Sequence, residues 1–289
     1  MILVDLNQVI LSNLMRQISV NNMKTVEEGL VRHMVLTSLR MFKNKFSDKY
    51  GTLVICCDDK KNWRKELFPY YKANRKKDRA ASDLDWQQIF ETINTIRDEL
   101  KDNFPWRVLQ VERAEADDII GTLCKRFGKQ LKNTDDENIL ILSSDKDFMQ
   151  LQKFANVDQY SPVKKQFLRM NNPSRYLKEH IMKGDRGDGI PNFLSADDTF
   201  MNEGRQKPIR SQSLGEWAIK EPEDFCSEKM MRGYKRNQQL VDLEFIPEDI
   251  SNNINQAYDD YQIKKGDLLN YFIKHRLKNH MENLSDFTE

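Results

Sequence analysis

Short apolar runs of strand length alternate along this chain with longer segments whose apolar residues recur at helical spacing. Four runs rich in Val, Ile and Leu show little alternation of apolar and polar positions, which is typical of parallel strands buried on both faces. The predicted strands are residues 2–6, 52–57, 108–112 and 139–143. Helical patterns lie between these runs, so the sequence predicts an α/β fold with a mostly parallel sheet between helices.

Three helices are predicted in the first half of the chain. Thr25 and Glu28 have the spacing of a capping box, so the first helix is expected to begin at Thr25. The second covers residues 83–102, where Trp86 and later apolar residues fall on one face. The third begins near Ala114 and follows the third predicted strand.

Strand patterns end near residue 170, and the rest of the chain is predicted to be mainly helical. Pro173, Pro222 and Pro247 each stand where a helix can begin, because proline is tolerated in the first turn. The helices expected here are residues 174–183, 223–243, 248–261 and 267–281, with a polar loop at residues 191–213. We therefore predict an α/β body at residues 1–170 and a helical C-terminal region at residues 171–289.

The composition narrows the class of protein. The 289 residues include 46 Lys or Arg and 45 Asp or Glu, and the net charge of +1 excludes a uniformly basic nucleic-acid coat. Four cysteines without a C-x-x-C pair exclude a disulfide scaffold and argue against structural zinc. No apolar run approaches the roughly 18 residues of a membrane span, and no signal peptide is recognisable. We expect a soluble, monomeric, cytoplasmic protein without a membrane partner.

Carboxylates fall where the predicted strands end. These acids are Asp5, then Asp58 with Asp59, then Glu112 followed by Glu115, Asp117 and Asp118, and finally Asp145 with Asp147. Any one of them alone would more often be a helix cap or a solvated residue at a strand end. Because the carboxyl ends of parallel strands share one edge of a sheet, acids from four strands are instead expected to meet in one site.

Carboxylates held together without a counter-charge repel one another, and divalent cations remove that repulsion. An all-oxygen set without His or Cys suits Mg²⁺ and also Mn²⁺. Two such ions about 4 Å apart can activate water and stabilise the leaving oxygen in phosphodiester hydrolysis. On an ideal helix Glu115 and Asp118 share a face and Asp117 points away. A later helix start would turn Glu115 and Asp117 toward the site, and both arrangements remain open.

A second acidic pair, Asp185 and Asp188, lies in a glycine-rich segment at residues 183–189. The glycines permit a tight turn and a close approach of the backbone to a ligand. By itself, this segment is equally well explained as an ordinary surface turn.

A strongly basic segment follows the second predicted strand. Residues 60–79 carry nine basic and two acidic side chains, a net charge of +7. The basic side chains are Lys60, Lys61, Arg64, Lys65, Lys72, Arg75, Lys76, Lys77 and Arg79. Four aromatic residues are interleaved with them, and such a mixture can hold phosphates with its cations while its rings stack on bases. A charge run alone is usually a solvated surface, but this one starts beside the predicted acidic site and therefore favours nucleic-acid binding.

Together these motifs resemble the 5′-nuclease superfamily, which includes flap endonucleases and the 5′-nuclease domains of bacterial DNA polymerase I. Within it, the chain is most similar to the T-even phage ribonuclease H group of 5′→3′ exonucleases. The motifs that carry the resemblance are Val4-Asp-Leu-Asn7, Cys57-Asp58, Trp63-Arg-Lys-Glu-Leu-Phe-Pro-Tyr-Tyr-Lys-Ala-Asn-Arg75, Glu115-Ala-Asp-Asp118, Ser143-Ser-Asp-Lys-Asp-Phe148 and Lys183-Gly-Asp-Arg-Gly-Asp188. The resemblance covers nearly the whole chain and implies a PIN-like nuclease body, a basic flap or arch at residues 60–82 and a DNA-binding C-terminal region.

The resemblance also implies roles for single residues. The acids that match the first metal site are Asp117, Asp145 and Asp147, with Glu115 and Asp118, while Asp5 and Asp58 match acids around the same cleft. Asp185 and Asp188 match the acids that serve a second ion. Arg64, Lys72 and Arg75 match the basic residues that grip the phosphate near the scissile bond. The other expected nucleic-acid contacts are Lys60, Lys61, Lys76, Lys77 and Arg79.

From these features we expect a Mg²⁺-dependent 5′→3′ exonuclease and flap endonuclease with ribonuclease H activity, in which Mn²⁺ can replace Mg²⁺. It would remove RNA primers and adjacent DNA during lagging-strand replication, in the host cytoplasm if a phage encodes it. Its expected partners are RNA·DNA and DNA duplexes with 5′ ends, nicks or flaps. The resemblance also suggests a single-stranded-DNA-binding protein and a sliding clamp as partners, although the sequence contains no motif for either.

Two other functions are compatible with parts of the sequence. An aspartyl-phosphate phosphatase would place a nucleophile at Asp5, but that chemistry usually requires a second Asp two residues later, where this chain has Asn7. A structure-specific DNA-binding module without important cleavage would be marked by the loss of key acids, and none is missing.

Overall fold

The computed structural model describes residues 1–21, 27–131, 137–202, 204–264 and 266–288. Its centre is a six-stranded sheet in the order β3-β2-β1-β4-β5-β6. The strands are β1 (Ile2–Asp5), β2 (Leu53–Cys57), β3 (Arg107–Gln110), β4 (Ile139–Leu142), β5 (Val157–Ser161) and β6 (Gln166–Leu168). All neighbouring pairs are parallel except β5 and β6, which run antiparallel. The predicted fold class, a mostly parallel sheet between helices, is confirmed.

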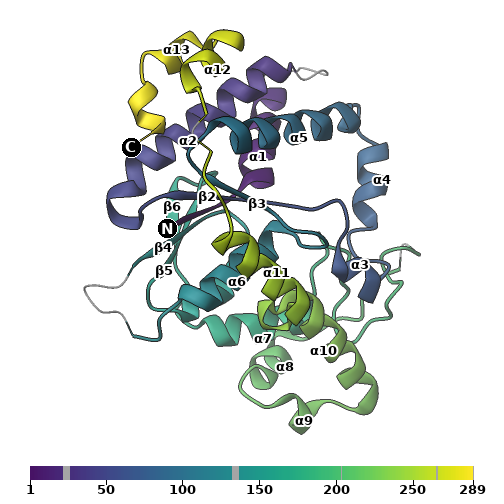
Figure 1. The fold of residues 1–289 in the computed structure, drawn as a ribbon. Coiled ribbons are helices and arrows are strands. Elements are labelled where there is room, and N and C mark those ends of the chain that lie inside the picture. The colour runs from purple at the N-terminus through teal and green to yellow at the C-terminus, as the bar shows by residue number, and fades with distance from the viewer. Residues whose placement is uncertain (22–26, 132–136, 203, 265, 289) are drawn as a thin grey trace.

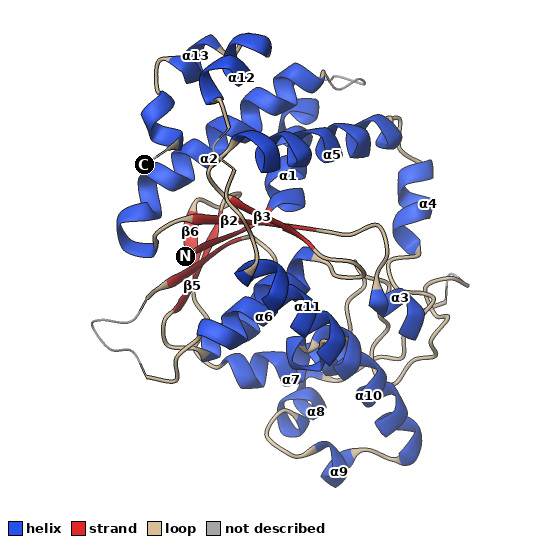
Figure 2. Cartoon of the chain, viewed as in Figure 1, coloured by secondary structure: helices blue, strands red, loops and turns tan. Residues whose placement is uncertain are grey.

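Helices cover both faces of this sheet (Figures 1 and 2). On one face lie α1 (Leu6–Asn21), α2 (Glu28–Tyr50) and α5 (Trp86–Asn103), which share one apolar core with the strands. On the other face lie α6 (Ala116–Phe127), the 3₁₀ helix η1 (Asp147–Lys153) and α11 (Glu248–Asp259), which share a second core. The strands β1, β2 and β4 are buried from both sides, which explains why their sequences are nearly continuous apolar runs.

The four predicted strands are all present, but β5 and β6 were not predicted. Every residue of β5 is buried, yet three of the five are polar, namely Asp158, Gln159 and Ser161. Their polar atoms have partners elsewhere in the fold, including Tyr50 for Asp158 at 2.6 Å. Such a strand cannot be recognised from hydrophobicity because tertiary hydrogen bonds, not apolar side chains, permit its burial.

The helices of the first half differ from the prediction mainly at their starts. Helix α1 was not predicted, and its first turn is capped by the Asp5 carboxylate through a 3.0 Å hydrogen bond from the Gln8 amide. The predicted start at Thr25 lies outside the described residues, and α2 begins at Glu28. The predicted helix at residues 83–102 is α5, which is capped by Asp85.

The C-terminal region is helical, as predicted. Besides α11, its helices are α7 (Pro173–Lys183), α8 (Ser211–Trp217), α9 (Pro222–Phe225), α10 (Glu228–Val241), η2 (Leu243–Phe245), α12 (Leu268–Lys274), α13 (Lys278–Met281) and η3 (Leu284–Phe287). Two predicted helices are each divided. Ser227 caps a new helix at α10, and Arg276, with a left-handed φ of 55°, separates α12 from α13.

This C-terminal region contributes to both cores. Phe272 and Phe287 belong to the core on the α2 side of the sheet, while Ile250 and Ile254 belong to the core on the α6 side. None of the helices in the described part of the chain is both long enough and apolar enough to span a membrane.

The basic segment forms two short helices, α3 (Trp63–Leu67) and α4 (Asn74–Ala80), which connect β2 to α5. Pro69 lies in the turn that separates them. Figure 1 shows α4 standing beside the sheet between α3 and α5. The segment therefore lies at the same side of the molecule as the residues that follow β2 and β3.

Candidate active site

The carboxylates that follow β1 and β2 each serve first as a helix cap. Asp5 caps α1, as described above, and is only 8% exposed. Asp58 accepts a 2.8 Å hydrogen bond from the Ala116 amide at the start of α6 and a 2.6 Å bond from the Asn7 side chain. These bonds fix both carboxylates at the C-terminal edge of the sheet. Both carboxylates therefore cap helices and also lie at the edge of the sheet where the sequence predicted a shared site.

The loop after β4 holds Asp145 and Asp147. The Ser143 hydroxyl accepts from the Asp145 amide at 3.1 Å, and Asp145 accepts from the Asp147 amide at 2.9 Å. Gln159 of β5 donates to the Asp145 carbonyl at 2.6 Å. The unpredicted strand β5 thus supports the loop that carries two of the candidate metal ligands.

The start of α6 separates the three acids of residues 115–118. Glu115 is the N-cap rather than a helical residue, and α6 begins at Ala116. Asp118 is fully buried, and it accepts hydrogen bonds from the Glu115 amide at 2.8 Å and from the Trp63 indole at 3.1 Å. Asp117 instead shares its surroundings with Asp5 and Asp145. Of the two arrangements left open by the sequence, the structure adopts the later helix start, and the Asp118 carboxylate is bonded to Trp63 and Arg64.

We call Asp5, Asp58, Glu115, Asp117 and Asp145 the acidic cluster. Burial and the neighbouring Asp58 raise the pKa of Asp5 to about 7. Burial and Asp147 raise the pKa of Asp145 to about 6. The pKa of Asp58 is also raised, by burial and by Glu115, and that of Asp117 by burial and Asp145. The raised pKa values of these four carboxylates mean that the protein supplies too little positive charge to stabilise their ionised forms. Divalent cations such as Mg²⁺ would supply that charge, and Mg²⁺ prefers the oxygen ligands that carboxylates provide.

Glu115 behaves differently from the rest of the cluster. Its burial disfavours the charged form, but Lys72 and Arg64 outweigh that effect and lower the pKa of Glu115 to about 2. Lys72 contacts one carboxylate oxygen at 2.6 Å, and Arg64 contacts the other at 3.2 Å. Glu115 is therefore the point at which the basic segment is joined to the acidic cluster.

Arg64 is more deeply buried than Lys72 and Arg75. Its side chain is 4% exposed, and it pairs with Asp118 at 2.8 Å as well as with Glu115. Its Nε atom donates to the Leu240 carbonyl of α10 at 2.9 Å. The guanidinium that the sequence placed at the phosphate is thus enclosed behind the site, where it ties α6 to the C-terminal region.

Lys72 and Arg75 face the second acidic pair. Arg75 pairs with Asp188 at 2.5 Å, and Lys72 lies 3.7 Å from the same carboxylate. The Tyr71 hydroxyl lies between the two acidic groups, 2.8 Å from Glu115 and 3.0 Å from Asp188. Tyr71 was not predicted to belong to the site, although its position next to Lys72 in the basic motif was a signal. The glycine-rich turn at residues 183–189 is therefore bound to the basic segment and is not a free surface turn.

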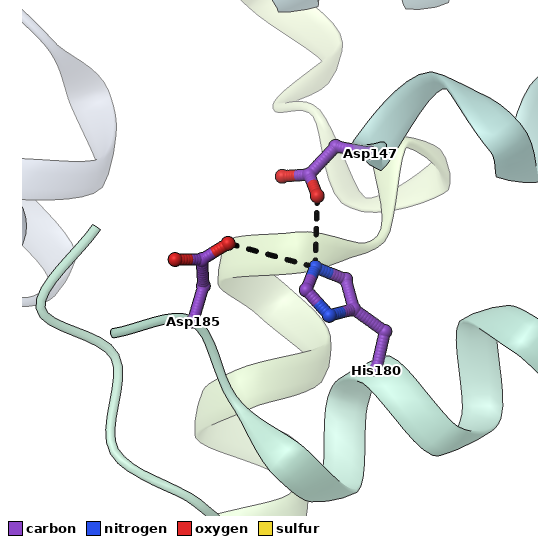
Figure 3. A group of neighbouring side chains, drawn as sticks. All are labelled: Asp147, His180 and Asp185. Atoms are coloured by element: carbon purple, nitrogen blue, oxygen red, sulfur yellow. Dashed lines mark hydrogen bonds and ion pairs between the residues drawn. The ribbon is translucent and has the colours of Figure 1, made fainter. Parts of the chain in front are cut away.

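Figure 3 shows a histidine that was not predicted to belong to the site. The Nε2 atom of His180 lies 2.8 Å from Asp147 and 3.9 Å from Asp185. Burial lowers the pKa of His180, but the hydrogen bond to Asp147 outweighs burial and raises it overall. His180 is 33 residues from Asp147 in sequence. Its place on α7, just before the glycine-rich turn, was the only signal that could have identified it.

The remaining residues of the basic segment lie farther from the acids. Lys60, Lys76 and Lys77 are exposed. Lys61 pairs with Glu112 at 2.9 Å, and the Glu112 side chain is 70% exposed. Glu112 lies two residues beyond β3 and faces solvent, whereas Glu115, the N-cap of α6, is the acid after β3 that contacts Lys72 and Arg64.

A cavity of about 390 Å³ opens between the basic segment and α5. Its lining includes Asp58, Glu115, Lys72, Arg75, Arg79 and Phe90. Arg79 lies over the Phe90 ring, 4.7 Å from its centroid. The cavity thus leads from the acidic cluster past several cations to an aromatic surface.

Comparisons with known proteins show which family the chain is similar to. Residues 1–181 match the family model described as 5′-3′ exonuclease, N-terminal resolvase-like domain, and residues 174–287 match the model described as T4 RNase H, C terminal. Ribonuclease H of Enterobacteria phage T4 is 31% identical over 296 residues, which cover 99% of this chain and 95% of that protein. A 5′-3′ exonuclease of Buchnera aphidicola subsp. Schizaphis graminum is 27% identical over 164 residues, which cover 54% of this chain and 53% of that protein.

Solved structures of bacteriophage T5 proteins share the fold. The D15 protein co-crystallised with metal ions superposes with a TM-score of 0.59 at 16% identity, over 90% of this chain and 99% of that one. A variant of the T5 flap endonuclease, in a pseudo-enzyme-product complex with DNA and metal ions, has a TM-score of 0.58 at 18% identity, over 89% of this chain and 97% of that one. The matched family models and the nearly full-length relative from phage T4 show that this chain belongs to the 5′-3′ exonuclease family with a resolvase-like N-terminal domain.

Proposed function

We propose that this protein is a Mg²⁺-dependent 5′→3′ exonuclease and flap endonuclease with ribonuclease H activity. The observation that carries the proposal is the acidic cluster, in which Asp5, Asp58, Asp117 and Asp145 have raised pKa values. The positive charge of Lys72 acts on the first three of these carboxylates. The likeness of the chain to the phage T4 ribonuclease H supports this function. Removal of RNA primers and adjacent DNA from lagging-strand duplexes is the role that fits such an activity.

The residues present fit two sets of ligands. The first ion would be held by Asp117 and Asp145, with Asp5, Asp58, Glu115 and Asp147 around it. The second would be held by Asp185 and Asp188, and burial together with the Asp188 carboxylate raises the pKa of Asp185. When bound, such ions supply a water of lowered pKa and stabilise the departing oxygen in phosphodiester hydrolysis. Asp118 is assigned no direct contact, because its oxygens are already bonded to Arg64, Trp63 and the Glu115 amide.

Lys72 and Arg75 would bind the phosphate next to the bond that is cut. Both are paired with carboxylates in the absence of substrate, Lys72 with Glu115 and Arg75 with Asp188. A phosphate that enters between these acids can take over the two cations, since charge-assisted hydrogen bonds to phosphate are strong and Arg binds it in a bidentate manner. This exchange would release Glu115 and Asp188 to bind metal only when a substrate is present.

The strand that carries the phosphate would continue into the cavity beneath the basic segment. Its cations can follow the backbone of a single strand, and Phe90 with Arg79 presents a surface on which a base can stack. We assign Lys60, Lys61, Lys76, Lys77 and Arg79 to this path. A monomer acting in the cytoplasm on nicked or flapped duplexes, aided by a single-stranded-DNA-binding protein and a sliding clamp, is the setting we propose.

The direct test is a cleavage time course on a nicked primer–template with a 5′-labelled downstream strand of RNA or DNA. We expect short labelled products with Mg²⁺ or Mn²⁺ and none with EDTA. Asp117→Asn is the control for a contaminating nuclease. A protein that binds the nicked duplex but leaves both strands intact with either metal would instead be a structure-specific binding module.

A further inference from the structure

Figure 3 shows one imidazole and two carboxylates that lie close together, those of His180, Asp147 and Asp185. One ligand atom from each residue lies within 4.8 Å of the other two. The side chains are 19%, 15% and 30% exposed, so each is held by the protein while one side remains open to solvent. We propose that these three residues form a Zn²⁺ site, in which His180 supplies a nitrogen ligand that the nuclease mechanism does not use.

The kinds of donor atom distinguish this site from the acidic cluster. Mg²⁺ prefers oxygen ligands and keeps several waters, and it gains little from an imidazole. Zn²⁺ binds imidazole nitrogen and carboxylate oxygen together, usually with three protein ligands and one open position. Affinity for such a mixed set is also greater for Zn²⁺ than for Mn²⁺, although the series reaches its maximum at Cu²⁺. A site of this composition should therefore hold Zn²⁺ in the presence of Mg²⁺.

The distances require only small movements. Ligand atoms at about 2.0–2.2 Å from a tetrahedral zinc lie roughly 3.4 Å apart. The Nε2 atom of His180 is 2.8 Å from Asp147 and 3.9 Å from Asp185, on either side of that separation. A rotation of the carboxylates is enough to admit an ion, which would replace the hydrogen bond between His180 and Asp147.

The backbone elements hold these residues together before any ion arrives. His180 lies on α7, which packs along η1, and η1 begins at Asp147. The Tyr176 ring, one turn earlier on α7, is stacked against the His180 ring with 24° between their planes. Asp185 follows the end of α7 after a single glycine. Two of the three ligands therefore sit on or beside one helix, which limits the entropy lost on metal binding.

The site spans two sets of acids that we assign to Mg²⁺. Asp147 belongs to the first set and Asp185 to the second, so Zn²⁺ bound between them would withdraw one carboxylate from each. Inhibition of Mg²⁺-dependent cleavage by Zn²⁺ is the functional consequence, and it rests on the proposed nuclease function. Metal binding itself does not rest on that function and can be measured without a substrate.

The test is calorimetric titration of Zn²⁺ into the metal-free full-length protein, in millimolar Mg²⁺ and above the ordinary imidazole pKa of about 6.5. We expect one tight site in the wild type and a loss of more than roughly 100-fold in Zn²⁺ affinity for His180→Gln, because changing even an outer-shell partner of a metal ligand costs roughly 10- to 100-fold. Nitrogen-15 NMR of labelled histidine should show a Zn²⁺-induced shift of one Nε2 resonance that is absent from this variant. Circular dichroism confirms that the variant is folded.

His275→Gln is the matched control, because His275 is also partly buried and lies 3.7 Å from a single carboxylate, Glu99. It should keep the wild-type Zn²⁺ affinity, whereas Asp185→Asn should lose affinity as His180→Gln does. Equal Zn²⁺ affinity in the wild type and His180→Gln would overturn the proposal and leave His180 as a hydrogen-bond partner of Asp147. Absence of Mg²⁺-dependent cleavage by the wild type without Zn²⁺ would instead refute the nuclease function alone.

Discussion

Arg64 and Asp118 form an ion pair that is almost completely enclosed, with 2.8 Å between Nη2 and Oδ1 and side-chain exposures of 4% and 0%. Removing one member of a buried pair leaves the other charged and unpaired, which costs about 3–5 kcal/mol. We therefore expect Arg64→Ala to lower the free energy of unfolding by about that amount, measured by urea denaturation. Cleavage should fall as well, because Arg64 also orients Glu115.

Arg113→Ala is the control for this prediction. Arg113 pairs with Glu66 at 2.7 Å, but both side chains are substantially exposed, so its loss should cost less than about 1 kcal/mol. If Arg64→Ala were as stable as the wild type and only weakened substrate binding, Arg64 would be a phosphate ligand, as the family resemblance implied.

The acidic cluster predicts a separation of activity from stability. Asp117→Asn and Asp145→Asn should each abolish cleavage while the metal-free proteins remain as stable as the wild type or become more stable. The reason is that each change removes one negative charge from a group whose neighbours repel it. Cleavage rates at saturating Mg²⁺ and thermal denaturation in EDTA are the two measurements. Glu112→Gln, which changes an exposed acid outside the cluster, should leave cleavage unchanged.

The raised pKa values also predict how stability depends on pH. The folded protein holds protons on Asp5 and Asp145 up to about pH 7 and pH 6, whereas the unfolded chain releases them near pH 4. Between those limits the native state binds more protons, so the metal-free protein loses stability as the pH rises. Glu115 has a lowered pKa of about 2, so its contribution to the free energy of unfolding increases as the pH rises, but only below about pH 4.5.

We therefore expect the metal-free protein to be less stable at pH 7.5 than at pH 5, by on the order of 2 kcal/mol in urea denaturation. Mg²⁺ should remove most of the difference, because it neutralises the ionised cluster, and Asp5→Asn should reduce the difference without metal. Greater stability in EDTA at pH 7.5 than at pH 5 would contradict this prediction, because it would show that ionisation of the acidic cluster does not destabilise the metal-free protein.

The last basic residues of the basic segment, Lys76, Lys77 and Arg79, should affect the affinity for nucleic acid more than the rate of cleavage. Replacing Lys76, Lys77 and Arg79 by Ala should weaken duplex binding and lower the slope of log K against log salt by about 1 for each phosphate that is no longer neutralised. The single-turnover rate at saturating enzyme should change little, since Lys72 and Arg75 remain in place. The measurements are Kd over a range of salt concentrations and single-turnover cleavage.

A triple variant outside both the basic segment and the C-terminal region, in which the exposed Lys101, Lys125 and Lys129 are changed to Ala, controls for the reduced net charge. Its salt slope should equal that of the wild type. Equal slopes for both triple variants and the wild type would mean that the end of the basic segment is a solvated surface.

Much of the site could be predicted from the sequence because of how parallel sheets are built. The strands β1 to β4 are buried on both faces, so they are visible as apolar runs, and the residues that follow them must share one edge of the sheet. Asp5, Asp58 and Asp145 were located by that argument alone. The basic segment was equally visible, since its charge is local in sequence.

Only the tertiary structure decided what depends on contacts between distant residues. Asp117 rather than Asp118 joins the acidic cluster because Trp63 and Arg64 hold Asp118 behind the start of α6. Arg64 looked like its basic neighbours in sequence, yet it is enclosed by two carboxylates and a carbonyl. His180 reaches Asp147 because α7 packs along η1. Sequence composition and periodicity indicate whether a residue is expected to be buried or exposed. They do not identify the partner of a buried charge, because that partner is brought close by the packing of elements that are far apart in the chain.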